Sequence, residues 1–260
     1  MQTTDFKITA NKAITKDVYE LTLSGNLPDI TPGQFVNIKI PGCYLRRPIS
    51  ISNWDNEAGT MTLIYKVVGE GTEILSRKKP NHSLELLLPL GNGFDTKLTT
   101  ENTLLCGGGV GVPPLIGLAK KMLAEGKSPE VVLGFNTKDE IFGVEKFQAL
   151  GLEPRITTVD GSFGIKGFVT DALKTVNFDY VCSCGPVAML KAIYSFVPQE
   201  NAASRSGALE KNSEIGGQYS FEARMACGFG ACMGCTCMTK EGYKRICKEG
   251  PVLLKEEILW

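Results

Sequence analysis

The sequence predicts a multidomain protein of the β plus α/β class, built in three consecutive parts. Short β-like runs fill residues 1–99, strands and helices alternate over 100–212, and five of the nine cysteines fall between Cys227 and Cys247. We therefore expect an antiparallel β-barrel (1–99), a parallel-sheet α/β domain (100–212) and a small cysteine-rich domain (213–260).

The barrel is predicted from short runs that turn residues separate. No long helical period interrupts the region, which is typical of a small antiparallel barrel. The predicted strands are Phe6–Ala10, Val18–Leu23, Gln34–Ile40, Pro48–Ser52, Thr60–Val68 and Ser83–Leu88.

The α/β domain is predicted to begin with a strand at Thr103–Cys106 and a helix at Pro113–Ala124, whose apolar residues repeat on one face. Further strands are expected at Val131–Phe135, Arg155–Val159 and Tyr180–Ser183, and further helices near Glu145–Leu150, Phe168–Thr175 and Val187–Phe196. Repeated βα units predict a parallel sheet covered on both faces. The stretch Pro198–Gly217 lacks an apolar period and is predicted to be a connector or mobile loop.

Charge and composition exclude several classes of function. The 28 basic residues match the 28 acidic ones, so no basic field favours a nucleic acid or an anionic membrane. The N-terminal residues lack the apolar run of a secretory signal, and no apolar run is long enough to span a membrane. We expect a soluble cytoplasmic protein, in which clustered cysteines hold a metal or serve redox chemistry rather than form disulfides.

The strongest motif is a C-x4-C-x2-C run with a further cysteine after eleven intervening residues: Cys227, Cys232, Cys235 and Cys247. A [2Fe-2S] cluster needs four thiolates, and the first spacing is that of plant-type ferredoxins. Interspersed glycines allow the loop to wrap a cluster closely. The alternative is a structural zinc site, although zinc usually takes two C-x2-C-like pairs. Cys237 is expected to be a strand residue that points elsewhere.

A second motif lies in the predicted barrel. Arg46-Arg47-Pro48-Ile49-Ser50 begins one β run, and Tyr65-Lys66 leads downstream to Gly71-Thr72 at an expected helix start. A flavin pyrophosphate is satisfied by a fixed guanidinium and free backbone N–H groups, and Ser50 could bond near the flavin N5 edge. The alternative for the arginine alone is a solvated surface charge.

Two shorter motifs belong to the α/β domain. The turn between its first strand and first helix contains Gly107, Gly108, Gly109 and Gly111, which would let the phosphates of a dinucleotide approach the backbone. It departs from G-x-G-x-x-G at Val112, and tight strand-to-helix packing is the alternative. Cys184-Gly185-Pro186 ends the last β run, where doubly wound sheets place ligands; a buried turn cysteine is its alternative.

Other chemically notable residues receive no predicted role. His82, the sole histidine, lies in a polar turn, and Trp54, Trp260 and Cys43 are expected to serve packing. No pair of residues suggests a general acid and base, so no catalytic residue is assigned.

The order of these motifs resembles that of the ferredoxin-NADP reductase superfamily. Within it, the chain most closely resembles the electron-transfer subunits of NAD-dependent, type B dihydroorotate dehydrogenases. The resemblance covers essentially the whole chain, and its most specific stretches are 45–52, 89–94 and 224–228.

The resemblance implies three cofactors. FAD would lie on the barrel at Arg47 to Ser50, Ile64 to Lys66, Gly71 and Thr72, and NAD would bind the α/β domain, with Cys184 and Gly185 bordering the nicotinamide. Cys227, Cys232, Cys235 and Cys247 would ligate the cluster. The partner would be an FMN-containing (β/α)8 catalytic subunit that oxidises dihydroorotate in pyrimidine (UMP) biosynthesis, in a heterotetramer of two copies of each chain. Electrons would pass from FMN through [2Fe-2S] and FAD to NAD+.

Two other functions remain open from the sequence. One is the flavin and iron-sulfur subunit of an NAD(P)H-ferredoxin or sulfide oxidoreductase, and the other is a non-enzymatic iron-sulfur redox sensor. The preference for NADH over NADPH rests on the resemblance alone, since no residue that would meet the ribose 2′ position can be identified.

Overall fold

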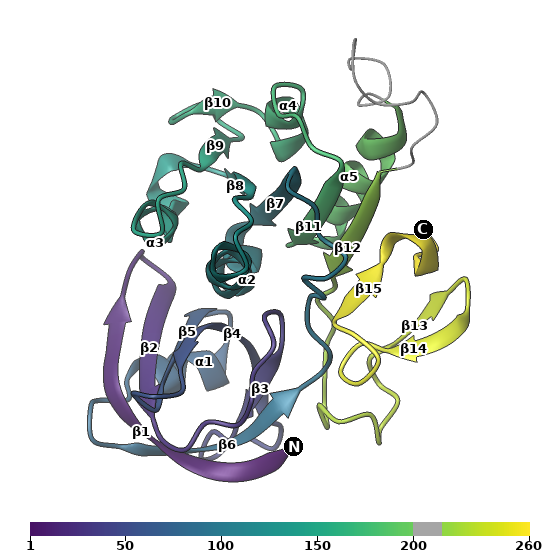
Figure 1. Cartoon of the computed structure of the whole chain (residues 1–260). Coiled ribbons are helices and arrows are strands. Elements are labelled where there is room, and N and C mark those ends of the chain that lie inside the picture. Colours follow the sequence, from purple (N-terminus) through teal and green to yellow (C-terminus); the bar gives the residue numbers. More distant parts are fainter. Residues whose placement is uncertain (200–214) are drawn as a thin grey trace.

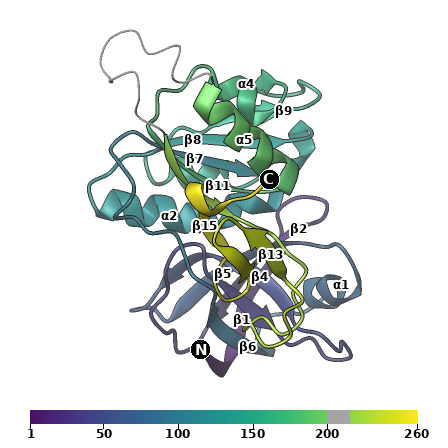
Figure 2. The same cartoon turned by 90° about the vertical axis from the view of Figure 1, so that its right-hand side faces the viewer.

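A computed structural model describes residues 1–199 and 215–260. It contains a closed β-barrel, an α/β layer stacked on the barrel and a C-terminal segment beside both (Figure 1). Figure 2 shows the C-terminal segment in front of the junction between the barrel and the sheet. No helix among the described residues is long and apolar enough to cross a membrane.

The barrel is antiparallel and closed, with strand order β1-β2-β5-β4-β3-β6. Leu84, Leu86, Leu88 and Leu90 alternate inward along the last strand, the period-two pattern of a strand with one buried face. The predicted barrel is confirmed. Its strands are β1 (Gln2–Ala13), β2 (Val18–Ser24), β3 (Phe35–Ile38), β4 (Arg47–Asp55), β5 (Thr60–Lys66) and β6 (Ser83–Leu90), and the short helix α1 (Glu70–Ser76) connects β5 to β6.

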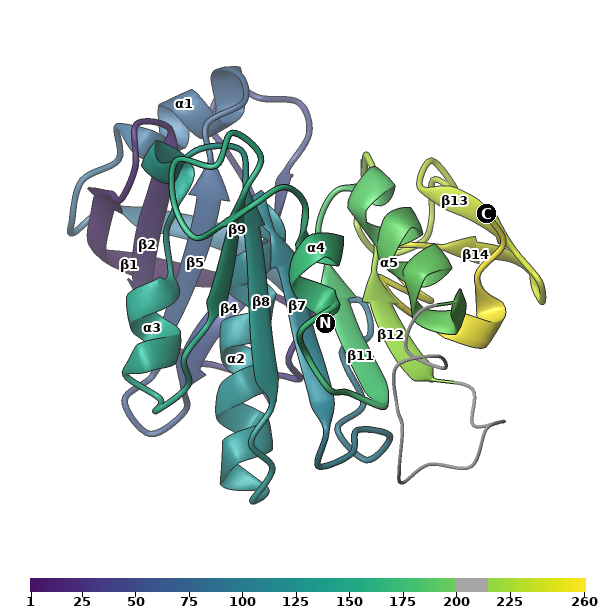
Figure 3. The ribbon, with the colours of Figure 1, turned by 90° about the horizontal axis from the view of Figure 1, so that it is seen from above.

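The second sheet has seven strands in the order β10-β9-β8-β7-β11-β12-β15, several of which Figure 3 shows side by side. They are β7 (Thr103–Gly108), β8 (Glu130–Phe135), β9 (Arg155–Thr158), β10 (Ile165–Lys166), β11 (Tyr180–Cys184), β12 (Gly216–Ser220) and β15 (Val252–Leu254). The predicted parallel arrangement holds for all but β15, which pairs antiparallel with β12. That edge strand returns from the cysteine-rich segment, so no crossover helix sets its direction.

Helices cover both faces of this sheet, as predicted. On one face α2 (Val112–Ala124) and α3 (Val144–Gln148) bury side chains with those of β8 and β9. On the other face, α4 (Val169–Leu173) and α5 (Val187–Gln199) contribute to a separate core. Short 3-10 turns η1 (Gly109–Gly111), η2 (Lys138–Glu140) and η3 (Lys255–Glu257) complete the connections.

The predicted connector was wrong at both ends. Helix α5 continues through Pro198 to Gln199, and β12 already begins at Gly216. The two glycines at its start permit this pairing, because a β-carbon on Gly217 would lie 2.8 Å from the Val181 side chain of the neighbouring strand. The rest of the predicted connector, and the domain boundary expected at residue 213, lie outside the described residues.

Helix α2 joins the α/β layer to the barrel. A β-carbon on Gly117 would lie 2.9 Å from the Trp54 ring, so the helix backbone packs directly on β4. Lys120 Nζ donates to Asn53 Oδ1 at 3.2 Å and to the Trp54 carbonyl at 3.3 Å. These contacts fix the barrel beneath the carboxyl edge of the parallel strands.

The cysteine-rich segment lies between β12 and β15, two strands of the same sheet. It contains the hairpin β13 (Thr236–Thr239) and β14 (Gly242–Arg245). Asn92 anchors its end to the barrel: its side-chain amide donates to the carbonyls of Glu249, at 2.8 Å, and Val252, at 2.9 Å. The sheet therefore holds both ends of the segment, and Asn92 also joins its C-terminal end to the barrel.

Candidate functional site

The carboxyl ends of the parallel strands β7, β8, β9 and β11 meet at one edge of the sheet. Two cavities open there. The barrel cavity, of ≈ 410 Å³, lies between the barrel and the sheet. The sheet-edge cavity, of ≈ 450 Å³, lies on the outer side of the glycine-rich turn.

The barrel cavity brings together most of the residues predicted to contact a flavin. Arg47, Pro48, Ile49, Ser50, Ile64, Tyr65, Lys66 and Thr72 all line it. Cys184, which was expected to border the nicotinamide, also lines it. The rest of the wall was not predicted as part of the site and consists of Phe35, Val68, Val110, Ser220, Phe221, Glu222, Ala223, Met225 and Pro251. The stretch from Ser220 to Ala223 carried no motif, and only its place after a strand end could have indicated it, whereas Met225 lies in the stretch 224–228 that carries the family resemblance.

Gly71 contributes by leaving room for Arg47. A β-carbon at Gly71 would lie 2.3 Å from Nε of Arg47, so the guanidinium lies directly against the first turn of α1. The Arg47 guanidinium also donates to the Leu45 carbonyl. The cavity thus has a fixed cation beside a helix start, an arrangement suited to a diphosphate.

Two other residues predicted to contact the flavin, Thr72 and Tyr65, use their side chains for hydrogen bonds within the protein. Thr72 Oγ1 accepts from the N–H of Val68 at 3.0 Å and donates to the Gly69 carbonyl at 2.9 Å, which shapes the loop before α1. Tyr65 is buried in the barrel core and its hydroxyl donates to Asn11 Oδ1 at 3.1 Å. Tyr65 can therefore offer the cavity its backbone rather than its phenol.

Cys184 stands where the barrel cavity meets the glycine-rich turn. A β-carbon on Gly111 would lie 2.1 Å from the Cys184 carbonyl oxygen, so the turn packs against the end of β11. Burial raises the pKa of the Cys184 thiol to about 12, although the Ser220 hydroxyl opposes this. The thiol is neutral at physiological pH and is not an activated nucleophile.

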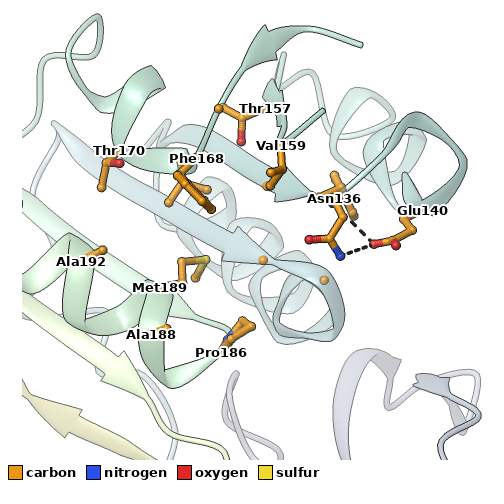
Figure 4. Close-up of a pocket in the computed structure, with 16 residues that line it drawn as sticks. Asn136, Glu140, Thr157, Val159, Phe168, Thr170, Pro186, Ala188, Met189 and Ala192 are labelled. Atoms are coloured by element: carbon orange, nitrogen blue, oxygen red, sulfur yellow. Dashed lines mark hydrogen bonds between the residues drawn. The ribbon is translucent and has the colours of Figure 1, made fainter. Parts of the chain in front are cut away.

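The sheet-edge cavity contains part of the predicted dinucleotide motif. Gly108, Gly109 and Pro186 line it, whereas Gly107, Gly111 and Gly185 lie beside it without lining it. A β-carbon on Gly107 would lie 2.9 Å from the Leu115 side chain, so for Gly107 the observed role is strand-to-helix packing. Figure 4 shows the cavity walls, which are apolar except at Asn136, Glu140, Thr157 and Thr170.

The four predicted metal ligands form two pairs. The Cys232 N–H donates to Cys227 Sγ at 3.5 Å, and the Cys247 N–H donates to Cys235 Sγ at 3.3 Å. Within residues 1–199 and 215–260, no three or more His, Cys, Asp or Glu side chains are placed to hold one metal ion together. The structure thus brings Cys227 to Cys232 and Cys235 to Cys247, the pairing expected if each pair holds one iron of a two-iron cluster.

The loop backbone favours a thiolate at Cys227. Burial acts against the charged form, but N–H groups of Cys232, Phe229 and Ala231 outweigh burial and lower the pKa of Cys227 to about 6. By contrast, burial and the neighbouring Cys235 raise the pKa of Cys247 to about 12. Cys237 lies in β13 opposite Lys244, as a strand residue, in agreement with the prediction.

Contacts from outside the loop hold it in place. Arg245 Nη1 donates to the Gly230 carbonyl at 2.9 Å, while its Nε donates to Glu249 Oε2 at 2.9 Å. Asn37 of the barrel strand β3 donates to the Cys227 carbonyl at 3.2 Å. The loop is therefore braced from the hairpin on one side and from the barrel on the other.

Comparison with known proteins agrees with this geometry. Residues 222–259 match the family model for the iron-sulfur cluster binding domain of dihydroorotate dehydrogenase B. The electron transfer subunit of dihydroorotate dehydrogenase B (NAD(+)) from Fusobacterium nucleatum is 42% identical, over 99% of each chain. The corresponding Bacillus pumilus subunit is 41% identical, over 96% of each chain.

The chain belongs to the family of dihydroorotate dehydrogenase B electron transfer subunits. The predicted family is thereby confirmed, as is the prediction of an oxidoreductase subunit.

Solved structures of ferredoxin reductases share the fold of this chain. The structure of an NADH-dependent reduced ferredoxin-NADP oxidoreductase, from work on flavin-based electron bifurcation, matches 98% of this chain and 90% of its own, with 29% identity and a TM-score of 0.84. A ferredoxin reductase of carbazole 1,9a-dioxygenase shares the fold at a TM-score of 0.65 and 21% identity, over 76% of this chain and 66% of its own. The predicted ferredoxin reductase-like fold is confirmed.

Proposed function

We propose that the chain carries electrons between the FMN-containing catalytic subunit of dihydroorotate dehydrogenase and NAD+, by way of a [2Fe-2S] cluster and FAD. One observation carries this proposal: the barrel cavity is walled by the barrel, by the end of β11 and by the stretch that leads into the cysteine loop. A group bound in this cavity would meet both the nucleotide side and the cluster side of the protein.

The cavity's own residues suit FAD. The Arg47 guanidinium, held against Gly71, would bind the pyrophosphate, and the backbone from Pro48 to Ser50 would lie along the flavin. Ser50 would offer a hydroxyl at the cavity wall. When bound, FAD supplies the exchange between the hydride of a nicotinamide and the single electrons of an iron-sulfur cluster.

The cysteine loop lies close to this cavity. Met225 lines the cavity and Cys227 follows two residues later, so their Cα atoms are at most about 7 Å apart. Cys227 with Cys232, and Cys235 with Cys247, would each hold one iron. Cys232 is exposed, which leaves this end of the loop open to a partner protein.

The residues of this chain position and insulate the cofactors rather than transfer protons. The Cys184 thiol is buried and neutral, and Gly108, Gly109 and Pro186 shape the space where NAD would bind. Gly185 and the nicotinamide would meet at the end of β11. No general acid or base is required for this function.

We place the protein in the cytoplasm. The buried Cys106 and Cys182 form no disulfide, and a clustered set of cysteines that holds iron suits a reducing compartment. The partner is the catalytic subunit, in the heterotetramer that the family resemblance implies.

A coupled assay tests the proposal. The purified chain is mixed with the FMN-containing catalytic subunit, and NADH formation from dihydroorotate and NAD+ is followed at equal subunit concentrations. NADH should form only when both chains are present. The proposal fails if the mixture reduces an artificial dye with dihydroorotate yet forms no NADH.

A second function is favoured by the 29% identity to the NADH-dependent reduced ferredoxin-NADP oxidoreductase. On that alternative the chain would exchange electrons with ferredoxin. Ferredoxin reduction by NADH in the absence of the catalytic subunit would support it, whereas dihydroorotate-dependent NADH formation would favour the first function.

A further inference from the structure

The outer face of barrel strand β3 lies between the flavin motif and the cysteine loop. Side chains alternate between the two faces of a strand. Val36 and Ile38 belong to the barrel core, so Phe35 and Asn37 point out of the barrel. Phe35 lines the barrel cavity. Strand β3 therefore directs Asn37 toward the region that separates this cavity from the cysteine loop.

Strand pairing places Asn37 beside the flavin motif. In the antiparallel ladder between β3 and β4, Phe35 lies opposite Ser50 and Asn37 lies opposite Pro48. Residues directly opposite each other share one face of the sheet, with Cα atoms about 4.5 to 5.5 Å apart. Pro48 and Ser50 line the barrel cavity, whereas Asn37 does not. Asn37 is thus one strand away from the residues proposed to lie along the flavin.

On its other side, Asn37 meets the first cysteine of the loop. Its Nδ2 donates to the Cys227 carbonyl at 3.2 Å. A β-carbon on Gly228 would lie 2.3 Å from the same Nδ2 and 3.4 Å from Leu90 Cδ1 on β6. The loop backbone therefore lies directly on the barrel at the first predicted cluster ligand, and Asn37 connects the two through its side chain.

The amide of Asn37 is unfavourable for the barrel alone. The residue is 0% exposed, and its Oδ1 has no hydrogen-bond partner among residues 1–199 and 215–260. Its neighbours on the same face, Leu87 and Phe35, are apolar. A buried amide with an unpaired acceptor costs free energy that an apolar side chain would avoid. The polar residue is therefore explained by its bond to the loop rather than by the stability of the barrel.

The orientation of this amide has an electrostatic consequence. Because Nδ2 bonds to Cys227, the positive end of the amide dipole points toward the cysteine loop. One-electron reduction adds a negative charge to an iron-sulfur cluster, and hydrogen bonds and dipoles around the cluster set its reduction potential. A fixed positive dipole end therefore favours the reduced form. Asn37 itself gains and loses neither an electron nor a proton.

We propose that Asn37 is a positioning residue for electron transfer, which holds Cys227 against the flavin side of the barrel and raises the reduction potential of the cluster. This inference rests on the proposed function, since it requires FAD in the barrel cavity and a cluster on the cysteine loop. It assigns to a barrel residue an effect on the bound cluster, beyond holding the loop in place.

The test compares Asn37→Leu with the wild-type holoprotein. Leucine branches at the same carbon as asparagine but cannot donate a hydrogen bond. The reduced cluster is followed by electron paramagnetic resonance during an anaerobic redox titration, and bound iron is measured separately. Iron content should stay the same. At a given potential the ratio of reduced to oxidised cluster should fall about threefold to tenfold, which lowers the midpoint potential by about 30 to 60 mV.

The matched control is Asn92→Leu. Asn92 also ties the cysteine-rich segment to the barrel through its amide, but it donates to the carbonyls of Glu249 and Val252 rather than to that of a cluster ligand. The midpoint potential of this variant should equal that of wild type. An equal shift in the two variants overturns the proposal, because any loosening of the segment would then produce it.

A second variant, Asn37→Val, replaces Asn37→Leu if leucine does not fit, because valine is shorter and suits a strand. An unchanged potential in either variant with its iron retained overturns the proposal, while the proposed function stands. Loss of the fold or of iron in both variants also overturns it, since Asn37 would then serve the structure alone. If NADH produces no reduced cluster even in wild type, the proposed function fails and this inference fails with it.

Discussion

A β-carbon on Gly111 would lie 2.1 Å from the backbone oxygen of Cys184. The glycine-rich turn and the end of β11 are therefore in backbone contact, and the barrel cavity lies on one side of this contact. Because neither backbone can withdraw without shifting a strand, Gly111 fixes the relative position of Cys184 and Val110, which both line that cavity.

Replacing Gly111 by alanine should damage this junction. We expect Gly111→Ala to lower the free energy of unfolding by about 1 to 3 kcal/mol, because overpacking forces a backbone shift, and to reduce flavin content. Urea unfolding and the ratio of flavin to protein absorbance measure both effects. The control is Gly126→Ala, which carries left-handed strain (φ +82°) but meets nothing within 4 Å. Equal flavin loss in both variants would argue against a specific role for the contact.

The contact between Gly71 and Arg47 predicts a selective effect on FAD. Gly71→Ala should displace the guanidinium and raise the Kd for FAD at least about tenfold, the cost of a charge-assisted hydrogen bond. Gly69→Ala is the matched control, because a β-carbon there meets nothing within 4 Å. Reconstitution of the flavin-free protein, followed by flavin fluorescence, gives both constants. If the Kd for FAD is unchanged in Gly71→Ala, Arg47 does not bind the pyrophosphate in the way proposed.

The two cysteine pairs predict which substitution removes the cluster. Cys232→Ala should abolish the broad visible absorption of the cluster and the bound iron, while flavin and NADH oxidation by artificial acceptors persist. Transfer from dihydroorotate to NAD+ should be lost. Cys237→Ala, in β13, should keep both iron and transfer. If Cys232→Ala still transfers electrons from dihydroorotate to NAD+, the cluster is not on the route.

The ion pair between Arg245 and Glu249 is expected to slow the loss of iron from the cysteine loop at neutral pH, where Glu249 is ionised. Hydrogen bonds from Arg245 lower the pKa of Glu249 to about 2, below its usual value of 4.5. The stabilisation is therefore fully present above pH 4.5 and is lost as the pH falls toward 2. At pH 7 Glu249→Gln should release iron to a chelator several-fold faster than wild type. Glu241→Gln removes an exposed partner of Lys244 and should match wild type; equal rates in the two variants would exclude the brace.

Local sequence patterns were sufficient for the barrel and for most of the α/β layer. A short β-like run bounded by turn residues identified β6, and an apolar repeat on one face identified α2. The antiparallel edge strand β15 was not predictable, because its three residues carry no period and its direction depends on a distant chain reversal. Similarly, the length of α5 and the start of β12 were set by packing against neighbours.

The sequence predicted those parts of the candidate site in which a single motif forms a whole wall of the cavity. The flavin motif identified the barrel side of the cavity, whereas the wall from Phe221 to Met225 became visible only once the cysteine loop was folded against the barrel. The glycine-rich turn was predicted to meet phosphates, but Gly107 and Gly111 serve packing contacts instead of lining a cavity. Glu140, which lines the sheet-edge cavity, could not be predicted to do so, because a lone acid in a turn forms no pattern in the sequence.

The most direct test of the central claim is an anaerobic titration of the purified chain with NADH, followed by visible absorption. We expect the flavin bands to bleach and the broader absorption of the cluster then to decrease, since electrons from the nicotinamide reach both cofactors. Bound flavin that stays oxidised in excess NADH, or a cluster that stays oxidised beside fully reduced flavin, would contradict it.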